Sequence, residues 1–585
     1  MEQARQRIWV CHALTGLLCL AFVGLIGRLA YINASMGPQL RAYSERRQRR
    51  TIEIPGRRGA ILDRQGRVLA GSFELPTVFA DPRLIEDHGA AATELADRLA
   101  MPVELVRRLL DKPTSPGFVI LKRGASIEEA SAVEGLNIRR VGTRQEPVRS
   151  YPMGSLAAQV LGFIGSDGQG LEGVERQYDD WLKPTPGKRV IYRDVRGRAA
   201  FQEEGSYIPP KNGGNITLTI DAAIQEVVER EVSRSVEKYK AESGIGIVMD
   251  TKTGEVLAMA SIPTFDPGDR GRSPRWTRRN RCLTDPVEPG SIFKPFIMAA
   301  ALSEKLTEPL ETIFCHNGLY VTGKRLLHDH HPYGGLTTAE IMIKSSNIGM
   351  AILGQRLGNQ RMYEALRAFG FGGKTGIDLP GESEGLLMPL KRWTSFSTTS
   401  VPMGQELAVT PIQMATAFCS LGNGGLLLTP RVVATLQDEQ GRIKEDRRDI
   451  DVQGQAMDPN TVAMMNEILT SVVSEGTGRN SRLDDYQVMG KTGTAQVPYT
   501  NRRGYEPDAY LGSFIAAAPS RDPAIVALVM IRKPSRKLGY YGGTVAAPAV
   551  KTILETTLPY LNIPADPPKL EENTTIVQAS PSDHD

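Results

Sequence analysis

The most constraining feature of this 585-residue sequence is an uncharged, mostly apolar run from Ile8 to Gly27, which Arg28 ends. Twenty helical residues rise about 30 Å, the thickness of the hydrocarbon core of a bilayer. A removable signal peptide has a shorter apolar segment and a small-x-small cleavage site, and no convincing site follows here. No comparable apolar helix is near in sequence to bury the run. We therefore predict one uncleaved transmembrane anchor at 8–27, with residues 1–7 in the cytoplasm.

More positive charges follow this anchor than precede it, which argues against export of the rest of the chain. Arg5 and Arg7 precede the anchor, but more arginines follow it, namely Arg28, Arg41, Arg46, Arg47, Arg49 and Arg50. The positive-inside rule alone would keep the C-terminal part in the cytoplasm. The cluster could instead lie against anionic headgroups on the outer face, or form a solvated linker.

Beyond the anchor, the composition is that of a globular protein of about three or four domains. Apolar residues make up 41% and charged residues 23%, which excludes wholesale disorder. The net charge of +4 is too small to argue for nucleic acid, and none is expected as a partner. The five cysteines include no CxxC pair, so neither a disulfide scaffold nor a ribbon-type zinc site is expected. The proline- and acid-rich segment 563–585 predicts a disordered tail.

Two modules are predicted between the anchor and the tail. Residues 45–210 read as an irregular α+β module that contains a strand–turn–strand pattern at 57–70. From 216 to 560 the pattern changes: strand-like runs stand at both ends, and more than two hundred mostly helical residues lie between them. This predicts an α+β domain whose antiparallel sheet is built from both ends of the segment and flanked by helices, with an all-helical insertion.

The first motif with chemical potential is Ser291 with Lys294, within Glu288–Phe296. Pro-Gly ends an extended segment and Ser291 opens an apolar helical run, so Ser291 and Lys294 share a face at i and i+3. A serine hydroxyl needs a neighbouring base to become a nucleophile, and a lysine with a lowered pKa can be that base. The N–H groups of the helix N-terminus could stabilise an oxyanion.

Two further motifs follow in order. Ser345-Ser346-Asn347 offers a hydroxyl that can relay a proton and an amide that can donate and accept toward a peptide. Lys491-Thr492-Gly493-Thr494 begins a strand-like run, where the lysine offers charge for a carboxylate and the glycine permits close approach of a ligand. A second Lys-Thr-Gly, at 374–376, lies in a glycine-rich segment before a proline and is interpreted as a turn.

Each motif alone is weak, but SxxK, SxN and KTG in this order form the set of penicillin-binding proteins and class A β-lactamases. The chain resembles a class B penicillin-binding protein of the FtsI-like division type, from the anchor to about residue 560. Further segments carry the resemblance: Arg58–Arg64, Gly170–Glu175, Gly254–Met259, Gly404–Gln405, Thr410–Gln413, Asn423–Gly425 and Tyr540–Gly543.

The resemblance implies an anchor, an N-terminal pedestal of the dimerisation type and a penicilloyl-serine transferase domain. It implies that Ser291 attacks the penultimate D-Ala of a peptidoglycan stem peptide, with Lys294 as base. Ser345 would relay the proton to the leaving amine and Asn347 would hold the peptide amide. An amine of a second stem peptide would then take the acyl group, and β-lactams would acylate the same serine.

The remaining expectations also follow from the resemblance. The substrate-binding residues would be Lys491, Thr492, Gly493 and Thr494, around the terminal carboxylate, and the N–H groups of Ser291 and Thr494 would form the oxyanion hole. No cofactor is expected. A membrane glycan polymerase of the SEDS type and other division proteins would be partners. Because the substrate lies outside the cytoplasmic membrane, the catalytic domain is expected there, against the charge rule.

Alternatives remain open at this stage. A D,D-carboxypeptidase or β-lactamase-like hydrolase would use the same residues with water as acceptor, and a divisome scaffold or β-lactam sensor would use the pedestal without catalysis. The cluster His328–His331, with Cys315 and His316 upstream, could bind zinc, but a polar loop explains it as well, and we expect no metal. Whether Cys282 and Cys315 pair is left open.

Overall fold

The computed structural model describes residues 2–39, 42–43, 49–113, 117–193, 199–202, 205–269, 271, 273–323, 325–499 and 501–566. The chain forms two compact units that interleave along the sequence. The first comprises Met1–Arg57, Pro76–Pro147 and Pro184–Gly213, and the second comprises Arg58–Leu75, Val148–Lys183 and Gly214–Asp585. The units therefore do not follow the expected linear division near residue 210, because two segments of the expected 45–210 module pack with the second unit.

The N-terminal helix is longer than the predicted anchor. Helix α1 covers Glu2–Tyr31 and continues through a π-helical turn at Ile32–Met36. None of its residues is buried against the protein. The helix is long and apolar enough to cross a membrane, which agrees with one span at 8–27.

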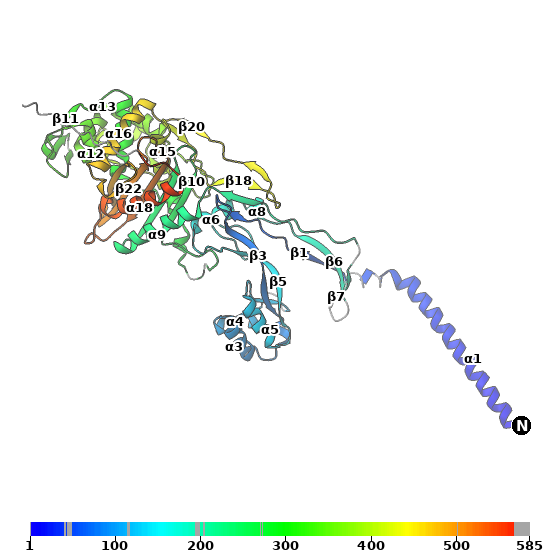
Figure 1. Cartoon of the computed structure of the whole chain (residues 1–585). Coiled ribbons are helices and arrows are strands. Elements are labelled where there is room, and N and C mark those ends of the chain that lie inside the picture. Colours follow the sequence, from blue (N-terminus) through cyan, green and yellow to red (C-terminus); the bar gives the residue numbers. More distant parts are fainter. Residues whose placement is uncertain are drawn as a thin grey trace, which may run out of the picture. The chain divides into compact units, whose positions relative to one another are not determined.

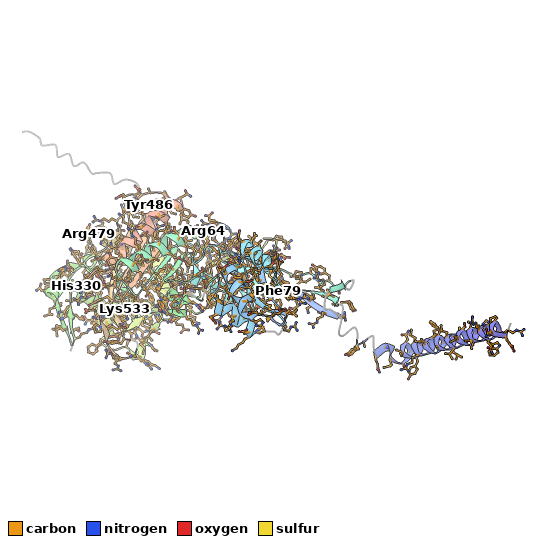
Figure 2. The ribbon with its side chains drawn as sticks, turned by 90° about the horizontal axis from the view of Figure 1, so that it is seen from below. Arg64, Phe79, His330, Arg479, Tyr486 and Lys533 are labelled. Carbon is orange, nitrogen blue, oxygen red and sulfur yellow. The ribbon has the colours of Figure 1, made fainter. Side chains whose placement is uncertain are left out.

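The first unit holds a small helical layer and an antiparallel ribbon. Phe79, labelled in Figure 2, packs its ring on Phe118 at a centroid distance of 5.5 Å. The core of the layer includes Leu95, Val106 and Val133. Its elements are β1 (Arg49–Ile54), the end of β3 (Val68–Ala80), α3 (His88–Arg98), α4 (Val103–Asp111), β4 (Val119–Lys122), α5 (Ile127–Gly135), the start of β5 (Val141–Ser150), β6 (Gly187–Arg193) and β7 (Ala199–Gln202).

The second unit is built on a five-stranded antiparallel sheet in the order β10-β9-β23-β22-β21. The predicted sheet from both ends of the domain is confirmed, because the early β9 pairs with the late β23. In this pairing Asp250 lies opposite Ile525 and Ser243 opposite Arg532. The strands are β9 (Ser243–Asp250), β10 (Val256–Ile262), β21 (Met489–Pro498), β22 (Tyr505–Ala518) and β23 (Ile525–Arg532).

Both faces of this sheet are covered, and β9, β10 and β23 are accordingly buried and apolar over most of their length (Figure 1). Val248 and Val529 point into one core with α9 (Ala222–Lys238) and α18 (Ala547–Tyr560). Ile247 and Leu528 point into the opposite core with α11, α13 and α15. Asp221 caps α9, since its side chain accepts from the N–H of Ala223.

The insertion between the two halves of the sheet is not all-helical, contrary to expectation. Short strands of two to five residues occur among its helices, bounded by glycine and proline, and such runs are too short to show a period of two. Its helices are α10 (Arg281–Thr284), α11 (Lys294–Ser303), α12 (Thr338–Lys344), α13 (Asn347–Ala368), α14 (Ser397–Ser400), α15 (Pro411–Cys419) and α16 (Pro459–Ser474). Its strands are β11 (Thr312–Phe314), β12 (Leu319–Thr322), β13 (Arg325–His328), β14 (Gly335–Thr337), β15 (Leu386–Leu387), β16 (Leu407–Ala408), β17 (Leu426–Leu428), β18 (Val433–Gln437), β19 (Ile443–Asp446) and β20 (Val452–Gln455).

A second sheet in this unit includes early residues. The predicted strand–turn–strand at 57–70 forms: β2 (Ile61–Leu62) pairs antiparallel with β3 and parallel with β8 (Asn215–Leu218). Beside it lie the short helices α6 (Ala158–Leu161), α7 (Gly173–Gln177) and α8 (Asp179–Leu182), whereas α17 (Gly542–Val545), which follows β23, packs on β21 and β22 of the five-stranded sheet. Of the predicted tail, Ile563–Asp566 are described and bond to residues 485–487; residues 567–585 lie outside the described part.

A buried ionic cluster ties these early segments together. Glu175 is fully buried, and its two carboxylate oxygens each accept from an arginine at 2.6 Å, Arg58 on one side and Arg149 on the other. Asp179 also pairs with Arg58 at 2.7 Å. Buried charges of this kind are tolerated only when they are matched, so removal of one partner leaves an uncompensated charge.

We predict that Glu175→Gln destabilises the second unit by about 3 kcal/mol or more, because it leaves Arg149 without its carboxylate. Thermal unfolding of the chain without its anchor measures the effect. The matched control is Glu226→Gln, whose pair with Arg230 is solvent-exposed, and about 0.5 kcal/mol or less is expected there. Equal midpoints for both variants would contradict the importance of the cluster.

Candidate active site

Ser291 lies on a tight turn at the start of α11. Gly290–Phe293 form a 3-10 turn and the α-helix begins only at Lys294, with Pro295 in its first turn. Gly290 has a φ of +58°, and a Cβ there would lie 3.1 Å from that of Ala495 on β21. In a 3-10 turn residues i and i+3 eclipse, so the shared face predicted for Ser291 and Lys294 is kept, although Ser291 precedes the α-helix.

Lys294 is fully buried and its amine is surrounded by oxygens. Nζ donates to the backbone carbonyl of Ser345 at 2.6 Å and to Oδ1 of Asn347 at 2.9 Å. The hydroxyl oxygen of Ser345 is 3.2 Å away. A neutral amine has two N–H groups and one lone pair, so it can satisfy both carbonyl oxygens and still accept a proton.

The second motif forms the junction between two helices. Ser345 ends α12 in the left-handed region, with a φ of 59°, a conformation that is unfavourable for a residue with a side chain. The next residue, Ser346, caps α13 by accepting from the N–H of Gly349 at 2.9 Å. Asn347 then starts α13. Two helix ends thus present the side chains of Ser345 and Asn347 to Lys294.

Asp329 supports this junction, and the sequence analysis missed that role. Its carboxylate accepts from the Ser346 hydroxyl at 2.6 Å and from the backbone N–H groups of Asn347 and Ile348. The negative charge lies at the N-terminus of the long helix α13, where the helix dipole favours it. The sequence singled out Asp329 only as part of the cluster His328–His331, for which a polar loop was an equal explanation and no metal was expected.

The third motif lies on strand β21. Lys491 is fully buried, and its Nζ donates to the Ser345 hydroxyl at 2.9 Å instead of lining the pocket. Thr492 and Thr494 do line the pocket. Gly493 permits close packing within the protein itself, because a Cβ there would lie 2.5 Å from Oγ of Ser513 and 2.8 Å from Cγ2 of Ile292.

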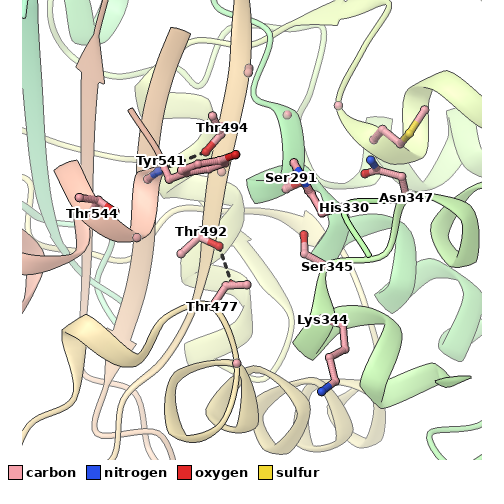
Figure 3. A pocket seen from close by; sticks show the side chains of 18 of the residues that line it. Ser291, His330, Lys344, Ser345, Asn347, Thr477, Thr492, Thr494, Tyr541 and Thr544 are labelled. Atoms are coloured by element: carbon pink, nitrogen blue, oxygen red, sulfur yellow. Dashed lines mark hydrogen bonds between the residues drawn. The ribbon is translucent and has the colours of Figure 1, made fainter. Parts of the chain in front are cut away.

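These elements meet in one pocket of about 900 Å³. Figure 3 shows Thr492 and Thr494 on one wall, with Ser291, Ser345 and Asn347 opposite. Thr477, which the sequence did not single out, bonds to the Thr492 hydroxyl at 2.6 Å. Also lining the pocket are segments earlier quoted only for resemblance: Gly404, Gln405, Tyr541, Gly542 and Gly543. The three motifs are therefore brought together, with Lys294 and Lys491 beneath the pocket surface.

Burial shifts the pKa values of both lysines. Burial lowers the pKa of Lys294 to about 7, and the negative charge of Asp329 partly opposes this shift. Burial lowers the pKa of Lys491 well below its usual value, and repulsion from Lys294 adds to the effect. Two ammonium groups around one serine hydroxyl repel each other in a medium of low dielectric constant. The site therefore favours a neutral amine near pH 7.

Other candidate residues lie apart from this chemistry. Among the described residues, no group of three or more histidine, cysteine, aspartate or glutamate side chains could hold a metal ion. His330 and His331 lie at the pocket rim, and the ring of His330 is 6.1 Å from that of Tyr541. Cys282 and Cys315 are free thiols. The second Lys-Thr-Gly, at 374–376, lies outside the strands, as predicted.

Comparison with known families agrees with this site. Residues 244–555 match the family described as the penicillin-binding protein transpeptidase domain, and residues 53–218 match the penicillin-binding protein dimerisation domain. The chain therefore belongs to the class B penicillin-binding proteins, and it is a serine-type peptidoglycan transpeptidase of the FtsI-like kind.

Individual relatives cover nearly the whole chain. Stage V sporulation protein D of Bacillus subtilis is 36% identical over 93% of this chain and 84% of its own length. Peptidoglycan D,D-transpeptidase FtsI of Escherichia coli is 30% identical over 97% of this chain and 94% of its own. Among solved structures, penicillin-binding protein 3 of Mycobacterium tuberculosis in complex with aztreonam has a TM-score of 0.68 and 29% identity, covering 88% of this chain and 99% of that one.

Acylation by a β-lactam should slow as the pH falls below about 7. Lys294 can accept a proton only as a neutral amine, and its pKa of about 7 places the loss of that form there. Stopped-flow measurement of acylation between pH 5 and 9 tests this. A rate that stays flat down to pH 5 would exclude a titrating base with this pKa.

Asp329→Asn should slow acylation about tenfold or more, since it weakens the charge-assisted bonds that hold Ser346 and Asn347. It should also move the acid limb of the pH profile to lower pH, because Asp329 raises the pKa of Lys294. Asp458→Asn is the matched control, since Asp458 caps α16 outside the pocket. A slower rate without a moved limb would contradict electrostatic coupling between Asp329 and Lys294.

Proposed function

We propose that this chain cross-links peptidoglycan stem peptides through an acyl-enzyme on Ser291, with Lys294 as general base. Ser291 Oγ bonds to the carbonyl carbon of the penultimate D-Ala while its proton passes to Nζ of Lys294. The C–N bond to the terminal D-Ala then breaks, and the leaving amine receives a proton through the hydroxyl of Ser345. The amine of a second stem peptide takes the acyl group and frees Ser291.

The other motif residues hold the donor peptide in this proposal. Asn347 binds the peptide amide, and the hydroxyls of Thr492 and Thr494 bind the terminal carboxylate. Lys491 is buried under the pocket and orients the hydroxyl of Ser345, to which its amine donates. The backbone N–H groups of Ser291 and Thr494 stabilise the oxyanion.

The observation that carries this proposal is the buried amine of Lys294. It is held by Ser345 and Asn347 beneath the pocket that Ser291 lines, and its pKa is lowered to about 7. General bases work best when their pKa lies near the working pH. A scaffold without catalysis would have no need to keep an amine unprotonated in a water-poor site.

We also propose a place in the cell for this activity. The chain acts in septal wall synthesis, beside a glycan polymerase of the SEDS type and other division proteins, and 30% identity to FtsI over 97% of the chain supports this. The catalytic domain lies outside the cytoplasmic membrane because its substrate is there. Large domains are translocated largely regardless of their charge, so the arginines after the anchor do not exclude this orientation.

Intact-mass spectrometry after incubation with benzylpenicillin tests the nucleophile. The chain without its anchor should gain one stable penicilloyl adduct, and Ser291→Ala should gain none. Slow loss of the adduct supports a transpeptidase, whereas rapid turnover would favour a β-lactamase-like hydrolase. An adduct on the Ser291→Ala variant would place the nucleophile elsewhere.

A further inference from the structure

The charged side chains that line the pocket form two groups, one of mixed sign near Thr477 and one with a single carboxylate beside Tyr505. Lys344 and Arg479 line it near Thr477, and Glu288 lines it beside Tyr505. Glu475 also lines the pocket and is solvent-exposed near Arg479. Arg479 and His330, both labelled in Figure 2, are exposed. Glu288 is therefore the only carboxylate on its side of the pocket among the described lining residues.

The register of β21 places Glu288 and the two cations, Lys344 and Arg479, at opposite ends of the pocket. The Ser291 turn packs against Gly493 and Ala495. Thr492, next to Thr477, lies on one side of this contact, and Lys344 lies toward the same end (Figure 3). Pro498 lies on the other side, where it pairs with Tyr505. At a rise of about 3.3 Å per residue, the two ends are about 20 Å apart, with Ser291 between them.

Glu288 is held in place without a counter-charge. Its Oε2 accepts from the Tyr505 hydroxyl at 2.9 Å, and the backbone N–H of Glu406 also stabilises the carboxylate. The side chain is partly buried, and no described lysine or arginine is among the groups that shift its pKa. Burial raises the pKa of this carboxyl, which makes it a better proton acceptor than an exposed glutamate.

The conformation around Glu288 keeps the carboxylate at the pocket wall. Gly404 and Glu406 both have positive φ, at 74° and 64°, and a Cβ on Gly404 would lie 2.3 Å from the carbonyl oxygen of Gly290. Arg325 donates to Gln405 at 3.2 Å. The groups that face Glu288 are thus Tyr505 and Glu406, with Arg325 acting on Tyr505. Residues 288–290, before Ser291, and residues 404–406 together form this wall of the pocket.

The reaction brings two substrates of opposite charge to Ser291. The donor ends in a carboxylate, whereas the acceptor amine is an ammonium ion at neutral pH. We propose that Glu288 forms the acceptor subsite, where its carboxylate binds the ammonium group of the second stem peptide and takes its excess proton. The inference rests on the proposed acyl-enzyme at Ser291 and names the side from which the acceptor enters.

The step balances in protons and bonds. The ammonium group gives one proton to the carboxylate of Glu288 and becomes a neutral amine. The amine nitrogen then bonds to the acyl carbon, the bond from that carbon to Ser291 Oγ breaks, and a second N–H proton passes to Ser291 Oγ through Lys294. Glu288 finally releases its proton to water.

Glu288→Gln tests this subsite, because the amide keeps an oxygen that can accept from Tyr505 and Glu406 but cannot bind or deprotonate an ammonium ion as a carboxylate does. The assay uses an N-acyl-D-alanyl thioester donor with D-alanine as acceptor, and compares aminolysis with hydrolysis. We expect aminolysis by D-alanine to fall at least tenfold relative to hydrolysis. Acylation by benzylpenicillin should stay within threefold of wild type.

Hydroxylamine, a nucleophile that is neutral at pH 7, is the matched acceptor control. The substitution should leave aminolysis by hydroxylamine unchanged relative to hydrolysis. The deficit with D-alanine should shrink as the pH rises toward 9.5, because more of its amine is then neutral. Glu475→Gln should leave the ratio of aminolysis to hydrolysis unchanged. Retained aminolysis by D-alanine in Glu288→Gln, or an equal loss with both acceptors, would overturn the proposal. Absence of the penicilloyl adduct in wild type would instead refute the proposed function.

Discussion

The site depends on one amine that is kept out of water. Lys294 is fully buried, and its Nζ is held by oxygens of Ser345 and Asn347. An ammonium ion in this place would lose its hydration, so burial favours the neutral form and lowers the pKa of Lys294 to about 7, although the negative charge of Asp329 partly opposes this shift. The left-handed Ser345 and the start of α13 each bring an oxygen to that amine, and β21 brings the amine of Lys491 to the hydroxyl of Ser345.

The two ends of the pocket suit the two oppositely charged substrates of the proposed reaction. Thr492 and the cations near it suit an anionic donor end, and Glu288 suits a cationic acceptor. Because β21 runs past both ends, one strand can position both substrates by register alone. In the proposed reaction the two substrates meet at Ser291, whose turn packs closely on β21 at Gly290 and Gly493.

Much of this architecture could be predicted from local sequence. The anchor and the antiparallel sheet follow from hydrophobic patterning, and the three motifs follow from their residues and spacing. The role of Asp329, the orientation of Lys491 and the interleaved units could not be predicted, because each depends on contacts between residues far apart in the chain. The short strands of the insertion were missed since two to five residues show no reliable period.

The order of strands in the central sheet also constrains how the chain is made. Strand β9 lies between β10 and β23, and residue Asp250 pairs with Ile525. During synthesis from the N-terminus, one edge of β9 therefore stays without its neighbour until almost the whole chain has emerged. An apolar strand with an open edge is prone to wrong pairing. The edge of β9 that later pairs with β23 is therefore open to wrong pairing during most of the synthesis of the chain.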